Sequence, residues 1–191
     1  MSNISKVSKY ICVLLVSMAT FQLITHLLLL FFGEKTVIGF NKLTISFSFF
    51  SGHISHQVSQ SWLNMAQALE AENFNSFAIL GSIELLPYLL IYFFLFKLFK
   101  FYQQGQIFTV ANITCFKNIG KTLLAWIGIN IFYPVLVTFI IRLSGLSDNL
   151  AIHVSVGSRE LFYLVSGLII YVMAWIMSMA IELKQEQELV V

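Results

Sequence analysis

Residues 77–96 read FAILGSIELLPYLLIYFFLF, an apolar run that carries a single ionisable acid, Glu84. Similar runs without charged residues cover 10–32, 123–141 and 161–181. A helix needs about 20 apolar residues to cross the hydrocarbon core of a bilayer, and backbone in lipid must satisfy its own hydrogen bonds. The four runs therefore predict an all-α membrane protein with four transmembrane helices.

The composition supports this fold class. The chain has 191 residues, of which 58% are hydrophobic and 10% are charged, whereas soluble domains have about 25% charged residues. The net charge of +2 is too small to predict direct nucleic-acid binding. Nucleophile elbows, phosphate-binding glycine loops and paired carboxylates within one membrane helix are absent from the sequence. We therefore expect a protein that is not an enzyme and has no cofactor.

The positions of the basic residues predict the orientation, because Lys and Arg are enriched in cytoplasmic loops. Seven of them fall in the N-terminal segment, in the connection between the second and third runs, and in the tail. They are Lys6, Lys9, Lys97, Lys100, Lys117, Lys121 and Lys184. The two other connections hold two basic residues each. Both termini are therefore predicted to be cytoplasmic.

These observations predict one integral membrane domain over residues 1–191. The predicted transmembrane helices cover about 10–32, 74–101, 121–141 and 160–183. The extracytoplasmic connections are then 33–73 and 142–159, the cytoplasmic connection is 102–120, and the cytoplasmic tail is 184–191.

The two outward connections contain segments in which apolar and polar residues alternate, at 43–49 and 150–156. Alternation with a period of two is typical of strands, so the two segments are predicted to pair as a small two-stranded extracytoplasmic ribbon. Apolar residues then recur at helical spacing within 53–72. This segment either forms an amphipathic helix along the outer membrane surface or extends the second transmembrane helix outward.

Glu84 is costly inside lipid and is expected to have a partner or a hydrated cavity. His26 is predicted at a similar depth, about 9 Å below the outer end of the first run. Gln22 lies one turn from His26, and Arg142 is another candidate counter-ion. The four residues form either a polar site that binds a cation or moves a proton, or an interhelical contact that sets helix register.

Three further histidines, His53, His56 and His153, are predicted on the outward side. His53 and His56 would share a face if they lay on a helix. Zinc or copper accepts such imidazoles, but no Cys or Asp accompanies them at a known spacing. These residues are weak metal candidates, and we predict no metal site.

The cytoplasmic connection contains a turn at 104–106, after which the Thr109 hydroxyl is positioned to cap a new helix. That helix is expected to continue into the third transmembrane helix near Gly120. The acidic segment 182–188 should extend the fourth helix into the cytoplasm. It is then a solvated helix end, a segment that docks on the basic loop, or a contact surface for a partner.

Two stretches carry a family resemblance. FKLFKFYQQGQIFT at 96–109 and the end of the chain, AWIMSMAIELKQEQELVV at 174–191, resemble motifs of the YoaS-like group, a bacterial domain of unknown function. Val190 departs from that pattern, in which Thr is common. The resemblance implies a multi-pass protein of the bacterial inner (cytoplasmic) membrane, without enzyme activity, often encoded beside a helix-turn-helix regulator.

The resemblance favours a regulatory or sensing role through the cytoplasmic face. A cytoplasmic protein, such as that regulator, would meet Gly105, Ile107, Phe108, Glu182, Glu186 and Glu188. The alternative function is a small transporter or channel that uses Glu84 and His26. The other expected partner is the lipid bilayer. The spacing of Ala174 and Ser178 permits close helix packing, either within the chain or in a homo-oligomer.

Overall fold

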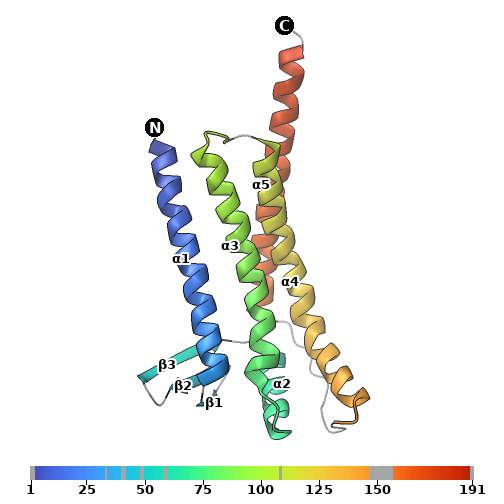
Figure 1. Ribbon diagram of the computed structural model, residues 1–191. Coiled ribbons are helices and arrows are strands. Elements are labelled where there is room, and N and C mark those ends of the chain that lie inside the picture. The colour runs from blue at the N-terminus through green and yellow to red at the C-terminus, as the bar shows by residue number, and fades with distance from the viewer. Residues whose placement is uncertain are drawn as a thin grey trace. The chain divides into compact units, whose positions relative to one another are not determined.

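The computed structural model describes residues 3–32, 34–39, 42–47, 50–57, 60–107, 109–146 and 157–189. In chain order the elements are α1 (Asn3–Phe32), β1 (Glu34–Gly39), β2 (Lys42–Phe47), β3 (Phe50–Gln57), α2 (Gln60–Ala71), η1 (Phe77–Gly81), α3 (Ser82–Gln103), α4 (Val110–Leu143) and α5 (Ser158–Leu189) (Figure 1). Four helices are long and apolar enough to cross a membrane: α1, η1 together with α3, α4, and α5. This confirms the prediction of four helices of transmembrane length.

The helices continue beyond the apolar runs that predicted them. α4 begins at Val110, so the helix expected in the cytoplasmic connection and the third predicted transmembrane helix are one element. The carbonyl of Thr109 accepts hydrogen bonds from the backbone N–H groups of Asn112 and Ile113, which starts this helix. The predicted cap by the Thr109 hydroxyl is wrong, because its Oγ1 is buried without a hydrogen-bond partner among the described residues.

The three strands form an antiparallel sheet in the order β1-β2-β3. Val37 of β1 pairs with Thr44 of β2, and Ile45 of β2 pairs with Ile54 of β3. Both edges of β2 are therefore occupied by its neighbours in sequence. The predicted two-stranded ribbon is not supported, since 43–47 pairs with β1 and β3, and residues 147–156 lie outside the described residues.

α2 differs from both predictions for the segment 53–72. The first part of that segment is strand β3, and the helix spans only Gln60–Ala71. It does not extend α3, because a turn follows in which Asn73 has a φ of 62°. Its apolar face is also not turned toward lipid: Trp62, Met65, Ala66 and Leu69 are all buried in the protein.

The chain divides into two compact units. Unit 1 comprises Met1–Phe21, Pro87–Trp126 and Phe162–Val191, and unit 2 comprises Gln22–Leu86 and Ile127–Leu161. α1, α3, α4 and α5 each contribute one part to unit 1 and another part to unit 2.

In unit 1, polar contacts join α1 to the end of α3. The Ser5 hydroxyl donates to the carbonyl of Gln103 (3.2 Å), and the Gln103 side-chain amide lies 3.2 Å from the sulfur of Cys12. The Cys12 thiol in turn lies 3.8 Å from the carbonyl of Phe96. Because these contacts recur at matching positions along both helices, they set the register of α1 on α3.

α4 and α5 pack closely in unit 1 through two glycines. A Cβ placed on Gly120 would lie 3.0 Å from the carbonyl oxygen of Gly167 and 3.1 Å from Cβ of Tyr171. A Cβ on Gly167 would lie 3.1 Å from Cβ of Leu123. Small residues permit such close backbone approach between membrane helices. Ala174, one turn beyond Tyr171, is fully buried.

Candidate functional site

Unit 2 contains the predicted residues Glu84, His26, Gln22 and Arg142. His26 is on α1, and its Nε2 lies 3.2 Å from the hydroxyl oxygen of Ser82 at the start of α3. Its ring also packs on Phe77 of η1, with 5.0 Å between ring centroids. These contacts bring His26 to α3 two residues before Glu84, which is 9% exposed.

The other two predicted residues have different environments. Gln22 is half-buried, one turn before His26 on α1, while Arg142 is exposed in the last turn of α4. His26 thus contacts Ser82 on α3, the helix that carries Glu84, and Phe77 on η1. That these residues form an ion or proton site stays a prediction.

A second acid, Glu160, was not predicted as a site residue. It belongs to the first turn of α5 and is only 2% exposed. One carboxylate oxygen accepts the backbone N–H of Gly157 (2.7 Å), and the other accepts the side-chain amide of Asn130 on α4. The bond to Gly157 is the half of a capping box in which the third residue of a helix reaches back to the residue before the helix.

The contact with Asn130 sets the depth of Glu160. Asn130 lies twelve residues before Arg142 on α4, which corresponds to about 18 Å along the helix axis. No charged residue occurs between Lys121 and Arg142, so Asn130 is near the middle of the uncharged part of α4. The half-thickness of the hydrocarbon core is about 15 Å. If the uncharged part of α4 crosses the hydrocarbon core, Glu160 lies at the depth of the bilayer interior, although it precedes the apolar run of α5.

Aromatic side chains connect the Glu160–Asn130 pair to α2 and η1. The indole N–H of Trp62 on α2 donates to the backbone carbonyl of Asn130 (3.0 Å). The Trp62 ring packs on the Tyr133 ring, with 5.8 Å between ring centroids. The Tyr133 hydroxyl donates to the carbonyl of Ile79 (2.7 Å). Ile79 lies in the π-helix η1, a rare geometry that is frequent at functional sites. α2, α4, α5 and η1 thus share one polar cluster, which we call the Glu160 cluster.

The Glu160 cluster was not predicted from the sequence, although two signals were present. Asn130 is an amide within an apolar run, and such a side chain needs a partner in lipid. Glu160 follows Gly157 at the spacing of a capping box. Neither signal identifies the other residue as its partner, because the pairing depends on the register between α4 and α5.

The predicted cytoplasmic surface lies at the start of α4 and the end of α5, both in unit 1. Gly105 is exposed, and its φ of +77° suits glycine in the turn after α3. Ile107 is half-buried, and Phe108 lies outside the described residues. Asn112 holds this turn: its side-chain amide donates to the carbonyls of Gln106 (2.6 Å) and Ile107 (2.7 Å).

The acidic part of this surface is helical. Glu182 and Glu186 are exposed on α5, and Glu188 belongs to the same helix, although its side chain lies outside the described part of the structure.

The weak metal candidates do not share a helix face. His53 and His56 lie in strand β3, so the helical spacing that would have placed them together does not form. Their side chains lie outside the described part, and the whole of His153 lies outside the described residues. Metal binding at these residues therefore has no geometry that supports it.

The comparisons with known proteins identify a family of unknown function and do not bear on the YoaS-like name. No curated protein and no solved structure matches the chain. A family model matches residues 4–191, which is nearly the whole chain and includes the Glu160 cluster. The chain therefore belongs to the family described as "Protein of unknown function (DUF2975)".

Proposed function

We propose that the chain is a non-enzymatic protein of the bacterial cytoplasmic membrane that senses or regulates through a cytoplasmic protein partner. Both termini and the turn between α3 and α4 would face the cytoplasm. The helix-turn-helix regulator implied by the YoaS-like resemblance is the first partner to test.

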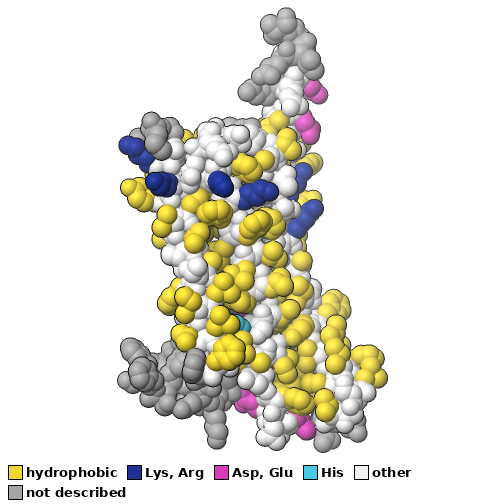
Figure 2. Space-filling model, viewed as in Figure 1, with side chains coloured by type: hydrophobic (Ala, Val, Ile, Leu, Met, Phe, Trp, Pro, Cys, Tyr) yellow, Lys and Arg dark blue, Asp and Glu magenta, His cyan; other side chains and the backbone are white. Residues whose placement is uncertain are grey.

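The distribution of lysines supports this orientation. Lys and Arg side chains form a band near one end of unit 1, and acidic side chains of α5 lie beyond it (Figure 2). Five of these lysines are exposed and Lys117 is half-buried; the set is Lys6, Lys9, Lys97, Lys100, Lys117 and Lys121. Because basic residues are retained on the cytoplasmic side, this band favours the cytoplasm for that end of unit 1.

The observation that carries the proposal is the length of α5. Its apolar run ends at Ile181, but the helix continues to Leu189 with Glu182, Gln185 and Glu186 exposed. This end continues α5 without a break, and the described protein leaves these side chains accessible to another molecule. A helical extension at the basic end is therefore suited to contact another protein.

The orientation is tested by labelling single cysteines with a membrane-impermeant maleimide after Cys12 and Cys115 are replaced by Ala. Lys121→Cys should react only after the cytoplasmic side is opened, and Ser144→Cys should react in intact spheroplasts. The opposite pattern would refute the orientation.

The partner is tested by photo-crosslinking in cells from position 185 of the tail and position 107 of the turn. Both positions should trap the same protein, and deletion of residues 182–191 should abolish the product from position 107. Position 144 is the matched exposed control and should not trap it. An absence of crosslinks from 185 and 107 would count against the proposed function.

A transporter or channel is the second candidate, favoured by the burial of Glu84 and Glu160 in unit 2. In that case Glu84→Gln should abolish ion flux in proteoliposomes, whereas the exposed control Glu182→Gln should leave it unchanged. Flux that is equal in the wild type, Glu84→Gln and empty liposomes would exclude this candidate.

A further inference from the structure

The register of α5 in unit 1 is defined by its contact with α3. The hydroxyl oxygens of Tyr88 on α3 and Tyr163 on α5 lie 3.3 Å apart. Both helices run toward the basic end of the unit (Figure 1). Lys97 and Val172 lie nine residues further along their helices, about 13 Å by helical rise, so these two residues are at the same level.

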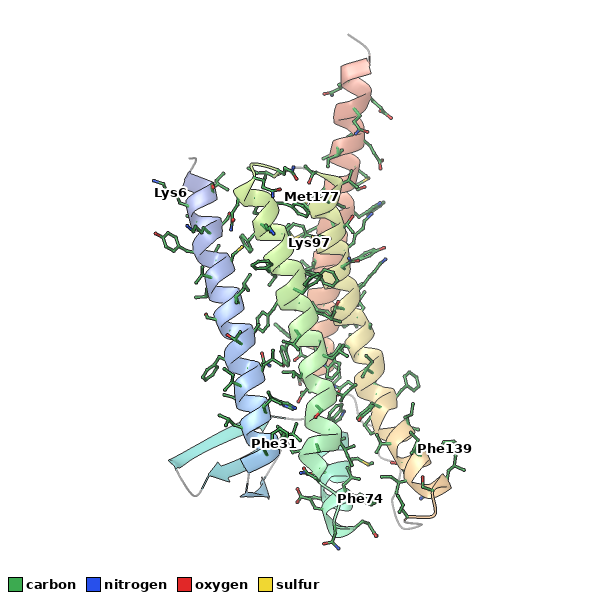
Figure 3. All side chains as sticks on the ribbon, in the orientation of Figure 1. Lys6, Phe31, Phe74, Lys97, Phe139 and Met177 are labelled. Atoms are coloured by element: carbon green, nitrogen blue, oxygen red, sulfur yellow. The ribbon has the colours of Figure 1, made fainter. Side chains whose placement is uncertain are left out.

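The contact with α4 sets the register of α4 on α5. Because a Cβ on Gly120 would lie 3.1 Å from that of Tyr171, the neighbouring Lys121 is level with Tyr171. By the spacing used for Lys97, Lys100 is level with Trp175. The lysines of α3 and α4 thus lie at about the level of residues 171–175 of α5. Met177 lies closer to the basic end than Lys97 (Figure 3).

α5 remains apolar beyond this level. Ile176, Met179 and Leu183 have 54%, 38% and 60% of their surface exposed. Leu183 lies about 12 Å beyond Trp175 along the helix. Lysine side chains place their ammonium groups in the headgroup layer, which adds only about 5–8 Å to each side of the hydrocarbon core. Leu183 therefore lies outside the hydrocarbon core, near the outer edge of the headgroup layer.

The three side chains form a stripe with the spacing of a coiled-coil seam. Their separations of three and four residues keep Ile176, Met179 and Leu183 on one side of α5. Glu186 occupies the next position of the seam, and Glu182 flanks it; both are exposed. A parallel second copy would bring two Glu186 side chains together, and like charges in this geometry are destabilising.

We infer that this stripe, together with Glu182 and Glu186, binds an amphipathic helix of a partner protein that carries apolar residues at heptad spacing flanked by Lys or Arg. The apolar stripe supplies contact area, and the two glutamates select a basic helix over an acidic one. The inference rests on the proposed function, because it requires this end of α5 to face the partner.

The test uses the full-length protein in nanodiscs of zwitterionic phosphatidylcholine, to which a basic peptide has little affinity. The probes are two synthetic helical peptides with the same heptad leucines, one with Lys and one with Glu at the flanking positions. Fluorescence anisotropy should show binding of the Lys peptide, with the Glu peptide at least about tenfold weaker.

Variants then locate the site. Leu183→Ser should weaken binding of the Lys peptide about tenfold or more, because the buried apolar contact is lost. Glu186→Gln should also weaken it. Gln185→Lys changes the net charge by +1, as Glu186→Gln does, but on the opposite side of α5. It should therefore weaken binding less than Glu186→Gln.

Several outcomes would overturn the inference. They are equal binding of both peptides, binding of neither, disulfide-linked dimers of Leu183→Cys, and quenching of a Leu183→Cys fluorophore by nitroxide lipids. If the cellular crosslink from position 107 needs residues 182–191 but survives Leu183→Ser and Glu186→Gln, the stripe is refuted and the proposed function stands. If neither position 107 nor position 185 traps a protein, both are refuted.

Discussion

The close packing of α4 on α5 makes a sharp prediction for Gly120→Ala. The three atoms nearest to the new methyl group would be Gly167 O at 3.0 Å, and Cβ and N of Tyr171 at 3.1 Å. Two of these belong to the backbone, so rotation of a side chain cannot relieve the contacts. Since non-bonded carbon atoms prefer about 3.5–4.0 Å, the two helices must separate by about half an ångström.

The expected cost follows from two opposing effects. Overpacking of this kind costs about 1–3 kcal/mol, while replacement of a helical glycine by alanine gains about 0.8–1 kcal/mol in helix propensity. Gly128 on the same helix is the matched control, because a Cβ there meets no atom within 4 Å. Gly128→Ala should therefore keep the gain alone, and the two variants should differ in free energy of unfolding by about 1–3 kcal/mol.

The assay is reversible unfolding in mixed micelles with increasing SDS, followed by circular dichroism, on the wild type and both variants. Gly120→Ala should unfold at a lower SDS fraction than Gly128→Ala. Equal midpoints would show that α4 and α5 do not approach as closely as the distances require, and the register of α5 used above would lose its support.

Three other variants probe polar contacts. Glu160→Gln retains one acceptor but leaves a buried donor unsatisfied, and should lose about 1–3 kcal/mol in the same SDS assay; Glu182→Gln, an exposed control, should stay within about 0.5 kcal/mol of the wild type. Asn112→Leu removes the donor to the carbonyls of the turn after α3, so proteinase K should cleave within 104–109 faster than in the wild type. Trp62→Phe keeps a ring against Tyr133 but loses the N–H donor, and should cost about 0.5–1.5 kcal/mol, measured as a lower thermal midpoint. An unchanged midpoint, cleavage rate or unfolding curve would contradict the contact concerned.

The four long helices were predictable because lipid leaves the backbone few alternatives. Residues 77–96 form a helix in the structure as the apolar run requires, since unpaired N–H and C=O groups are too costly in hydrocarbon. The connection between α1 and α3 was less predictable, because the strand pattern at 43–49 does not specify its partner. β2 pairs with β1 and β3, which are its neighbours in sequence, and short connections favour such local pairing.

Glu160 shows why the candidate site was only partly predictable. A hydropathy window begins the fourth run at 161 and leaves the acid in a loop, where a charge carries no cost. Its burial is a consequence of where α5 begins relative to α4, and that depends on contacts such as the one with Asn130. Glu84, by contrast, was found because its own neighbours in sequence are apolar. A carboxylate at the start of a helix can thus be recognised as a buried group only once the packing of that helix on its neighbour is known.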